Sequence, residues 1–303
     1  MCIRDRGAVQ LNKLIPALKS IALEPGSNVN VDETWCRYQT HFGHKKTYMW
    51  CLVNKKACIV IFFYEDCLDE LGTKHEGGRG RSVLKDFLGD AQIKSLQSDG
   101  YNVYMYLDDE LMEVEHLCCL AHARNKFKDA YNQGCEKAHF FLEQIAKLYT
   151  REDDYRRFNL TASKIKEKRN DTYTNGIVNA LRSELYDLLA LPEAGMSDLM
   201  RTALNYLHKF WNQLFAYRKD GEYTIDNLAA ERAIRPLTVQ RKNSLFFCST
   251  KGALRSAVYN TFIETCKQAG ISFRSFFCKY MTEIRKSRTD YENLLPMTIG
   301  LTN

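Results

Sequence analysis

The chain has 303 residues, a net charge of +6 and 45% hydrophobic residues, which exclude a disordered chain and allow one large domain or two of ordinary size. No apolar run approaches the roughly 18–20 residues that span a bilayer, and no signal peptide opens the sequence. Eleven cysteines are scattered without a Cys-x-x-Cys pair, which indicates reduced thiols rather than disulfides or a zinc ribbon.

The first 26 residues show little pattern. Met1–Arg6 fits no periodicity, and Leu11–Pro16 fits a short helix that Pro16 breaks. From Asn28 onward, period-two alternation and apolar runs predict three strands whose short connections suit an antiparallel meander. The three predicted strands span residues 28–35, 46–53 and 57–64.

A helix and two further strands are predicted next. Residues 82–88 form an amphipathic helix and residues 93–98 a fourth strand, and a short fifth strand at Glu115 runs into another helix. This order of elements predicts an α/β fold built on a mixed sheet of five strands.

Two aspartates lie on predicted strands. Asp32 falls within the first strand, and Asp99 ends the fourth. If these two strands are neighbours, the two carboxylates lie close together and repel each other unless a cation lies between them. Together with a third carboxylate from a helix, they form an oxygen-ligand set that suits Mg²⁺.

The stretch Tyr223–Leu237 predicts a helix. Asn227, Glu231 and Arg235 are four residues apart and share one face of it. An amide, a carboxylate and a guanidinium on one face suit a site that cuts phosphodiester bonds. The carboxylate would bind a metal ion, and the arginine would bind the phosphate. A solvated helix face is the alternative.

The ends and the packing of this helix are also predicted. Thr224 or Asp226 caps its start, and Pro236 makes continuation past Arg235 unfavourable. Because the alanines at 229, 230 and 233 have small side chains, this side of the helix can approach a sheet closely.

His116, Cys119 and His122 are spaced by three residues, which suggests a zinc site. A fourth ligand is not evident, and on an α-helix residues spaced by three move progressively away from a single face. A packed cluster of polar side chains is therefore the alternative.

Residues 125–218 show helical spacing throughout and predict an all-helical block inserted between the sheet and the Glu231 helix. Within this block, Lys164–Arg169 is predicted to be a basic polar face. Between Arg232 and Arg288, twelve Lys or Arg stand against two acids, a net charge of +10. This excess indicates a polyanionic partner, with nucleic acid as the leading candidate and a solubilising surface as the alternative.

Seven motifs occur in one order along the chain. They are Val31-Asp-Glu-Thr34, Ser98-Asp-Gly-Tyr101, His116-x-x-Cys-x-x-His-Ala-Arg124 with Lys126-Phe127, Asp226-Asn-x-x-Ala-Glu-Arg-x-Ile-Arg-Pro236, Arg241-Lys-Asn-x-Leu-Phe246, Ser249-x-x-Gly-Ala253 and Leu294-Leu-Pro296. Each motif alone is weak, but the ordered series resembles the insertion sequence 66 family of bacterial DDE transposases over about residues 28–300.

The resemblance implies an RNase H-like catalytic domain with a large helical insertion before its last acid and a helical C-terminal region. By this resemblance, the first part of the catalytic core is residues 28–124 and the insertion is residues 125–220. The last part of the core, with the Glu231 helix, is residues 221–268, and a C-terminal helical tail is residues 269–303. Residues 1–27 are expected to be an unassigned remnant or linker.

The resemblance also implies the site residues. Asp32, Asp99 and Glu231 match the three catalytic acids and would hold two Mg²⁺ ions, for which Mn²⁺ can substitute. One ion would activate the attacking water or DNA 3′-hydroxyl, and the other would stabilise the leaving 3′ oxygen. The expected DNA contacts are Arg232, Arg235, Arg241 and Lys242, and the expected supporting residues are Asn227, His122 and Arg124.

Two sets of neighbouring acids are alternatives to these. Glu33 adjoins Asp32, but strand alternation turns it to the opposite face of the sheet. Asp108, Asp109 and Glu110 follow Asp99 closely and fit a loop or the start of a helix.

The implied function is metal-dependent cleavage and strand transfer of an insertion sequence, with double-stranded DNA at the element ends and at the target as partner. Synapsis of two ends would require a homo-oligomer, although no heptad seam supports one. No membrane is involved, and the implied location is the bacterial cytoplasm in association with the nucleoid. A nuclease of the same fold that cuts without joining, and a catalytically silent DNA-binding remnant, are the alternatives.

Two features depart from the family pattern. Family members usually carry an N-terminal region that recognises transposon ends, whereas this chain has almost nothing before Asn28, so a truncated copy is expected. The stretch after Gly270 also lacks an expected acid–proline pair.

Overall fold

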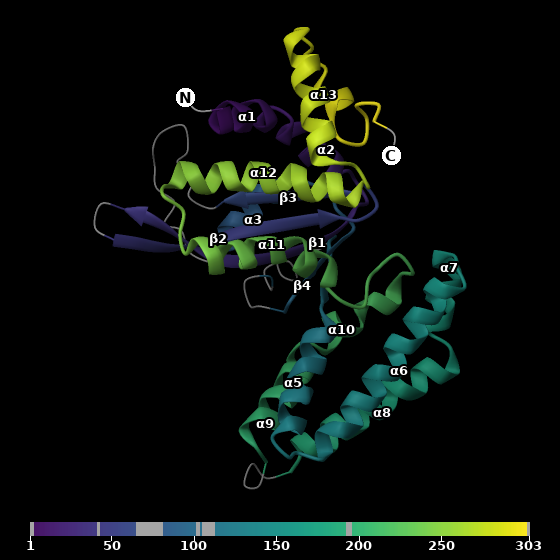
Figure 1. Ribbon diagram of the computed structural model, residues 1–303. Helices are drawn as coiled ribbons and strands as arrows, with labels where there is room; N and C mark the ends of the chain where they lie inside the picture. Colours follow the sequence, from purple (N-terminus) through teal and green to yellow (C-terminus); the bar gives the residue numbers. More distant parts are fainter. Residues whose placement is uncertain are drawn as a thin grey trace. The chain divides into compact units, whose positions relative to one another are not determined.

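The computed structural model describes residues 3–40, 43–64, 81–100, 104, 113–191 and 196–301. Within these residues, five strands form one mixed sheet in the order β3-β2-β1-β4-β5, which confirms the predicted α/β fold (Figure 1). The strands are β1 (Asn28–Thr40), β2 (Gly43–Asn54), β3 (Ile59–Tyr64), β4 (Ser95–Ser98) and β5 (Glu115–Cys118). Strands β1 and β4 are neighbours, which is the condition on which the prediction for Asp32 and Asp99 depends.

The chain divides into two compact units. We call them the sheet unit, which consists of Met1–Leu96, Asp109–Val114 and Leu228–Asn303, and the helical unit, which consists of Gln97–Asp108 and Glu115–Asn227. Each unit has its own buried apolar cluster.

An antiparallel meander forms the centre of the sheet unit, as the sequence predicts. Strand β1 pairs with β2 along its length, and β2 pairs with β3 from Met49 to Asn54. The first strand continues to Thr40, well beyond the predicted end at residue 35. The outer part of the β1–β2 hairpin therefore extends past the end of β3.

Helices cover both faces of this meander. Helices α11 (Leu228–Ser244) and α12 (Thr250–Gln268) lie across one face (Figure 1). There Ala233 and Ala257 belong to one buried cluster with alternate strand residues such as Met49. On the other face, Phe87 of α3 (Arg81–Leu88) stacks on Phe63 of β3 at a ring separation of 3.9 Å. Buried apolar side chains on alternate strand positions thus hold helices on both sides.

The outer edge of β3 is closed by two threonines of α12. Thr261 Oγ1 accepts a hydrogen bond from the Phe62 N–H (2.8 Å), and Thr265 Oγ1 accepts one from the Val60 N–H (3.0 Å). The Thr265 hydroxyl also donates to the Val60 carbonyl (2.9 Å). These hydroxyls satisfy buried peptide groups that would otherwise require another strand.

The prediction that Pro16 breaks a short helix over Leu11–Pro16 is wrong. Residues Ile3–Asn12 form helix α1, and Ile15–Ala22 form helix α2, in which Pro16 lies in the first turn. Proline is tolerated there because the first N–H groups of a helix have no intrahelical acceptor. Helix α1 is fixed to α12 by an ion pair between Asp5 and Arg255 (3.0 Å).

The prediction that Pro236 ends its helix is also wrong, because α11 continues to Ser244 with Pro236 inside it. An internal proline costs roughly 3 kcal/mol. The turns after it contribute the buried Leu237 and the strand-binding Arg241, and burial of one such apolar side chain is worth about 1.5–3 kcal/mol. Packing against the sheet therefore offsets the proline.

The C-terminal part of the sheet unit is helical. Helix α13 (Phe273–Arg285) matches the predicted last helix, and the 3₁₀ turn η3 (Tyr291–Leu294) follows it. Phe276 of α13 stacks on Phe262 of α12 at a ring separation of 5.7 Å, and the Tyr280 hydroxyl donates to the Gln10 carbonyl of α1 (2.8 Å).

The helical unit confirms the predicted all-helical block. Its described helices are α5 (Leu120–Asn132), α6 (Lys137–Arg157), α7 (Ala162–Arg169), α8 (Thr172–Leu189), α9 (Asp198–Lys209), α10 (Trp211–Phe215) and the 3₁₀ helix η2 (Ala216–Lys219). Phe127 of α5 and Phe141 of α6 stack at 4.3 Å in the core. Gly221 permits a close approach, because a Cβ there would lie 1.9 Å from the Ala162 carbonyl oxygen.

The predicted basic face of Lys164–Arg169 requires a correction. Arg169 is 3% exposed, and all five of its donors are used. Two go to the Glu152 carboxylate (2.8 and 2.7 Å), and three go to the carbonyls of Tyr217, Asp220 and Tyr223 (2.7, 2.5 and 3.0 Å). The guanidinium joins α6 and α7 to the segment that follows η2. Arg169 is therefore structural.

No helix among the described residues is long and apolar enough to cross a membrane.

Candidate active site

Asp32 lies on the face of β1 that packs under α11. It stands directly opposite Cys51 of β2, and Cys51 belongs to the apolar cluster that α11 and α12 cover. The Asp32 side chain is partly exposed, and its Oδ1 accepts a hydrogen bond from the Glu33 N–H (2.9 Å). Burial, together with the charges of Asp32 and Glu264, raises the pKa of the Cys51 thiol well above its ordinary value. Cys51 is therefore a neutral neighbour of the carboxylate.

The rival acids are separated from Asp32 or lie outside the described residues. Glu33 is buried and stands opposite Trp50, on the other face of the sheet, as alternation predicts. Asp108, Asp109 and Glu110 lie outside the described residues.

Glu231 lies in the first turn of α11, where a carboxylate interacts favourably with the helix dipole. It is partly exposed, while Ala230 and Ala233 beside it are buried against the strands. The predicted role of these alanines is thus confirmed, because small side chains let α11 lie close to the sheet. Asp32 and Glu231 belong to the same unit and to the same side of the sheet.

Asp99 lies in the helical unit, directly after β4, and its backbone is fixed by α9. The Tyr206 hydroxyl donates to the Asp99 carbonyl (2.6 Å). Gly100 follows with φ +79°, and a Cβ there would lie 2.5 Å from the Tyr206 oxygen, so glycine is required. Burial, with the nearby Cys118, Cys119 and Asp99, raises the pKa of Tyr206, which therefore stays a donor. No sequence signal indicated Tyr206.

Asn227 differs from its prediction in part. Helix α11 begins at Leu228, so Asn227 stands at the position that precedes the helix and not within it. It is fully buried, and its N–H donates to the Cys119 sulfur (3.2 Å). The predicted cap Thr224 instead donates its hydroxyl to Gln97 (3.0 Å). The prediction that Asn227, Glu231 and Arg235 share one helical face is therefore wrong for Asn227, which lies outside the helix.

In the predicted His116–Cys119–His122 group, His116 has polar partners of its own, whereas Cys119 and His122 lie close together. His116 is buried, and its Nε2 lies 3.0 Å from the Ser98 hydroxyl and 4.0 Å from the Cys118 sulfur. Cys119 and His122 bring their ligand atoms within 4.8 Å of each other. The Ser98–His116 contact favours the alternative of a packed polar cluster for His116. The predicted supporting residue Arg124 is exposed on α5.

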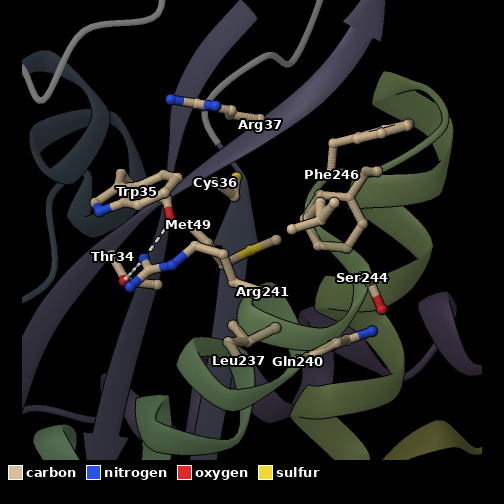
Figure 2. Close-up of a pocket in the computed structure, with 12 residues that line it drawn as sticks. Thr34, Trp35, Cys36, Arg37, Met49, Leu237, Gln240, Arg241, Ser244 and Phe246 are labelled. Carbon is tan, nitrogen blue, oxygen red and sulfur yellow. Dashed lines mark hydrogen bonds between the residues drawn. The ribbon is translucent and has the colours of Figure 1, made fainter. Parts of the chain in front are cut away.

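The four predicted phosphate-binding cations fall into two groups. Arg232, Arg235 and Lys242 are exposed on α11. Arg241 instead bonds to β1, with Nη1 2.8 Å from Thr34 Oγ1 and 2.7 Å from the Trp35 carbonyl oxygen (Figure 2). Its guanidinium carbon lies 3.9 Å from the centre of the Trp35 ring. Arg241 therefore anchors α11 to β1.

Arg241 lines a small cavity between α11 and the outer part of β1. The cavity has a volume of about 20 Å³, which is room for about one water molecule, so it fits no organic ligand. Beyond it, the Phe247 N–H donates to the Arg37 carbonyl (2.7 Å), and the Gln39 N–H donates to the Phe247 carbonyl (2.8 Å). Arg241 and Phe247 together satisfy the outer edge of β1.

The fold and these positions define an α/β protein with acids on one side of a sheet and exposed arginines on the helix that crosses it. Residues 3–255 match the transposase family IS66, and the chain belongs to that family. The family expected from the seven ordered motifs is thereby confirmed.

Two uncharacterized proteins of Sinorhizobium fredii are similar to this chain. The protein y4qI is 29% identical over 235 residues, which are 74% of this chain and 42% of y4qI. The protein y4jD is 25% identical over 210 residues, which are 66% of this chain and 40% of y4jD. The chain thus spans about two fifths of the length of these curated relatives.

Proposed function

We propose that this chain is the catalytic part of a transposase that cuts DNA at the ends of an insertion sequence and joins the freed ends to target DNA. The family match supports the class of protein. The observation that carries the chemistry is the shared sheet face of Asp32 and Glu231, together with the adjacency of β1 and β4, the strand that leads into Asp99. This order of strands is also the support for an RNase H-like fold.

The proposed cofactor is a pair of Mg²⁺ ions held by Asp32, Asp99 and Glu231. The donor set fits, because carboxylate oxygens are the ligands that Mg²⁺ prefers and because all three side chains are partly exposed. Such ions, when bound, polarise a scissile phosphate and lower the pKa of a nucleophilic oxygen.

The chain's own residues have three proposed tasks. Arg232, Arg235 and Lys242 are cations on the surface of α11 and would neutralise DNA phosphates near the cut. Arg241 would act by positioning, since it fixes α11, and with it Glu231, to β1. Tyr206 would hold the peptide of Asp99. Double-stranded DNA is the proposed partner, bound by a homo-oligomer in the nucleoid when two element ends are brought together.

The test is incubation of the purified chain with duplex DNA from the ends of the element in Mg²⁺ or Mn²⁺. We expect nicks that leave a 3′-hydroxyl, followed by joined products. Asp32→Asn, Asp99→Asn and Glu231→Gln should each abolish nicking. Glu33→Gln is the matched control, because it changes the adjacent acid on the opposite face and should leave nicking intact.

The products distinguish the proposed function from its alternatives. Nicking without joined products would indicate a nuclease, and binding without nicking would indicate a silent remnant. Nicking that persists in all three variants, with unchanged thermal stability, would refute the assignment of the acids.

A further inference from the structure

The hairpin of β1 and β2 carries a basic and aromatic surface outside the proposed catalytic residues. We call residues 35–40 and 43–48 the outer ribbon, the part that extends past the end of β3. On one face of it, three cross-strand pairs follow one another: Trp35 with Tyr48, Arg37 with Lys46, and Gln39 with His44. These six side chains share a face because each strand alternates.

The opposite face of the outer ribbon is used by the fold. Cys36, Tyr38 and Thr47 are buried there, and the first two belong to the cluster under α11. By contrast, Arg37 and Lys46 are exposed on the paired face. The ribbon therefore has one face for folding and another that projects its cations into solvent.

The charge on this face is of one sign. Its charged residues are Arg37 and Lys46, and from Trp35 to Trp50 the sequence has no Asp or Glu. Arg37 and Lys46 stand directly opposite each other, an arrangement of like charges that destabilises a pair of strands. A local conflict of this kind marks a functional surface, and an anion between the two side chains would relieve it.

Aromatic rings hold these cations without neutralising them. The Arg37 guanidinium lies 5.5 Å from the centre of the Trp35 ring, and the Lys46 ammonium lies 5.8 Å from the same ring and 5.5 Å from that of Tyr48. A ring attracts a cation through its quadrupole but carries no net charge. The full positive charge of both side chains therefore remains for a ligand.

The geometry favours double-stranded over single-stranded nucleic acid. Single strands bind by stacking bases on open aromatic faces. The Trp35 ring is already covered by the Arg241 guanidinium at 3.9 Å (Figure 2). Arg37 and Lys46 flank the same ring. Duplex DNA, on the other hand, presents closely spaced phosphates that exposed cations can contact without open aromatic faces.

We propose that the outer ribbon binds the sugar–phosphate backbone of duplex DNA, with Arg37 and Lys46 on phosphates and without reading base sequence. This inference rests on the proposed function, in which duplex DNA is the partner, and it adds a contact surface to the cations of α11. Since the contacts are to phosphate, the ribbon contributes equally to binding of element ends and of target DNA.

The experiment compares the Arg37→Gln, Lys46→Gln double variant with wild type for binding to a duplex of about 30 base pairs and arbitrary sequence, from about 50 to 200 mM salt. EDTA is present so that no cleavage occurs, and fluorescence anisotropy gives Kd. The double variant should lower the magnitude of the log Kd–log salt slope by about 1.8 and raise Kd roughly tenfold or more.

Lys55→Gln is the matched control, because Lys55 is an exposed lysine in the β2–β3 turn, at the end of β2 that is far from Lys46. It should leave the slope unchanged. Lys46→Gln alone separates charge from folding, because it removes the like-charge pair: it should be at least as stable as wild type and still lower the slope by about 0.9.

The outcomes distinguish failure of the ribbon proposal from failure of the proposed function. Double-variant binding with the wild-type Kd and slope overturns the ribbon proposal and leaves the proposed function in place. Failure of the wild-type chain to bind any duplex overturns both. A loss that affects a single-stranded oligonucleotide of the same length, but not the duplex, overturns the proposal in favour of single-strand binding.

Discussion

The two units use arginine in opposite ways. In the helical unit, Arg169 is buried and gives all five donors to one carboxylate and three carbonyls. In the sheet unit, Arg37 is exposed and rests against the ring of Trp35. A guanidinium that the protein satisfies stabilises the fold, whereas one held by a neutral ring keeps its charge for a ligand.

Arg241 stands between these extremes. It belongs to a basic motif, yet it bonds to Thr34 and to the Trp35 carbonyl. A count of basic residues therefore overestimates the positive surface available to an anionic ligand, since it includes cations that the fold has already used. The following predictions test this comparison by removing satisfied groups from each unit.

The largest effect is expected for Arg169→Met. The change leaves the Glu152 carboxylate, 12% exposed, without its partner and removes the donors to three carbonyls. Removal of one member of a buried ion pair costs about 3–5 kcal/mol of unfolding free energy. Urea denaturation followed by circular dichroism measures it.

The matched control is Arg156→Met in the same unit. Arg156 pairs with Asp153 at the surface, where the two side chains are 73% and 69% exposed. Such a pair contributes about 0–1 kcal/mol. Equal losses for Arg156→Met and Arg169→Met would contradict the distinction between satisfied and exposed arginines.

A smaller effect is expected for Thr265→Val in the sheet unit. The substitution keeps the side-chain shape but removes the hydroxyl that bonds the Val60 N–H and carbonyl. A buried peptide group left without a partner costs about 1–3 kcal/mol.

Thr282→Val is the control for this change. Thr282 is an exposed residue of α13, and its hydroxyl donates to the Cys278 carbonyl of the same helix (2.9 Å). Loss of this hydroxyl should change the free energy of unfolding by no more than about 0.5 kcal/mol in denaturation experiments. If both threonine variants unfold at the same urea concentration, the closure of the β3 edge contributes nothing measurable.

The smallest effect concerns pH. Burial raises the pKa of the Cys266 thiol on α12 from 9.0 to about 12. Between these values the unfolded chain loses a proton that the folded chain keeps, so stability falls as pH rises through this window. We expect a shallower fall between pH 9 and 11 for Cys266→Ala than for wild type, measured by urea denaturation.

Thiol labelling checks the same group. The thiolate is the reactive form, so native Cys266 should react far more slowly than exposed Cys278 on the next helix. Fast labelling of Cys266 in the folded chain, or parallel pH profiles of the two proteins, would show that this thiol ionises freely.

Much of the fold could be predicted from the sequence because local pattern and tertiary packing agree there. The strands of the meander alternate, the inserted block has helical spacing, and the small residues beside Glu231 do face the sheet. The position of Asp32 also follows from alternation, since it places Glu33 on the other face.

The failures come where distant residues overrule a local rule. Pro236 lies inside α11 because the helix after it packs on β1, and Pro16 begins a helix rather than ending one. β1 continues past residue 35 because Phe247, more than two hundred positions later, satisfies its outer edge. Spacing also could not show that Arg169 is satisfied by carbonyls some fifty residues away.

The threonine-bonded edge of β3 has a consequence for assembly. A second polypeptide can lengthen a sheet only where a row of peptide groups is open to it. On β3, the groups of Val60 and Phe62 are already bonded to the hydroxyls of α12. Two copies of this chain therefore cannot join their sheets through these groups of β3.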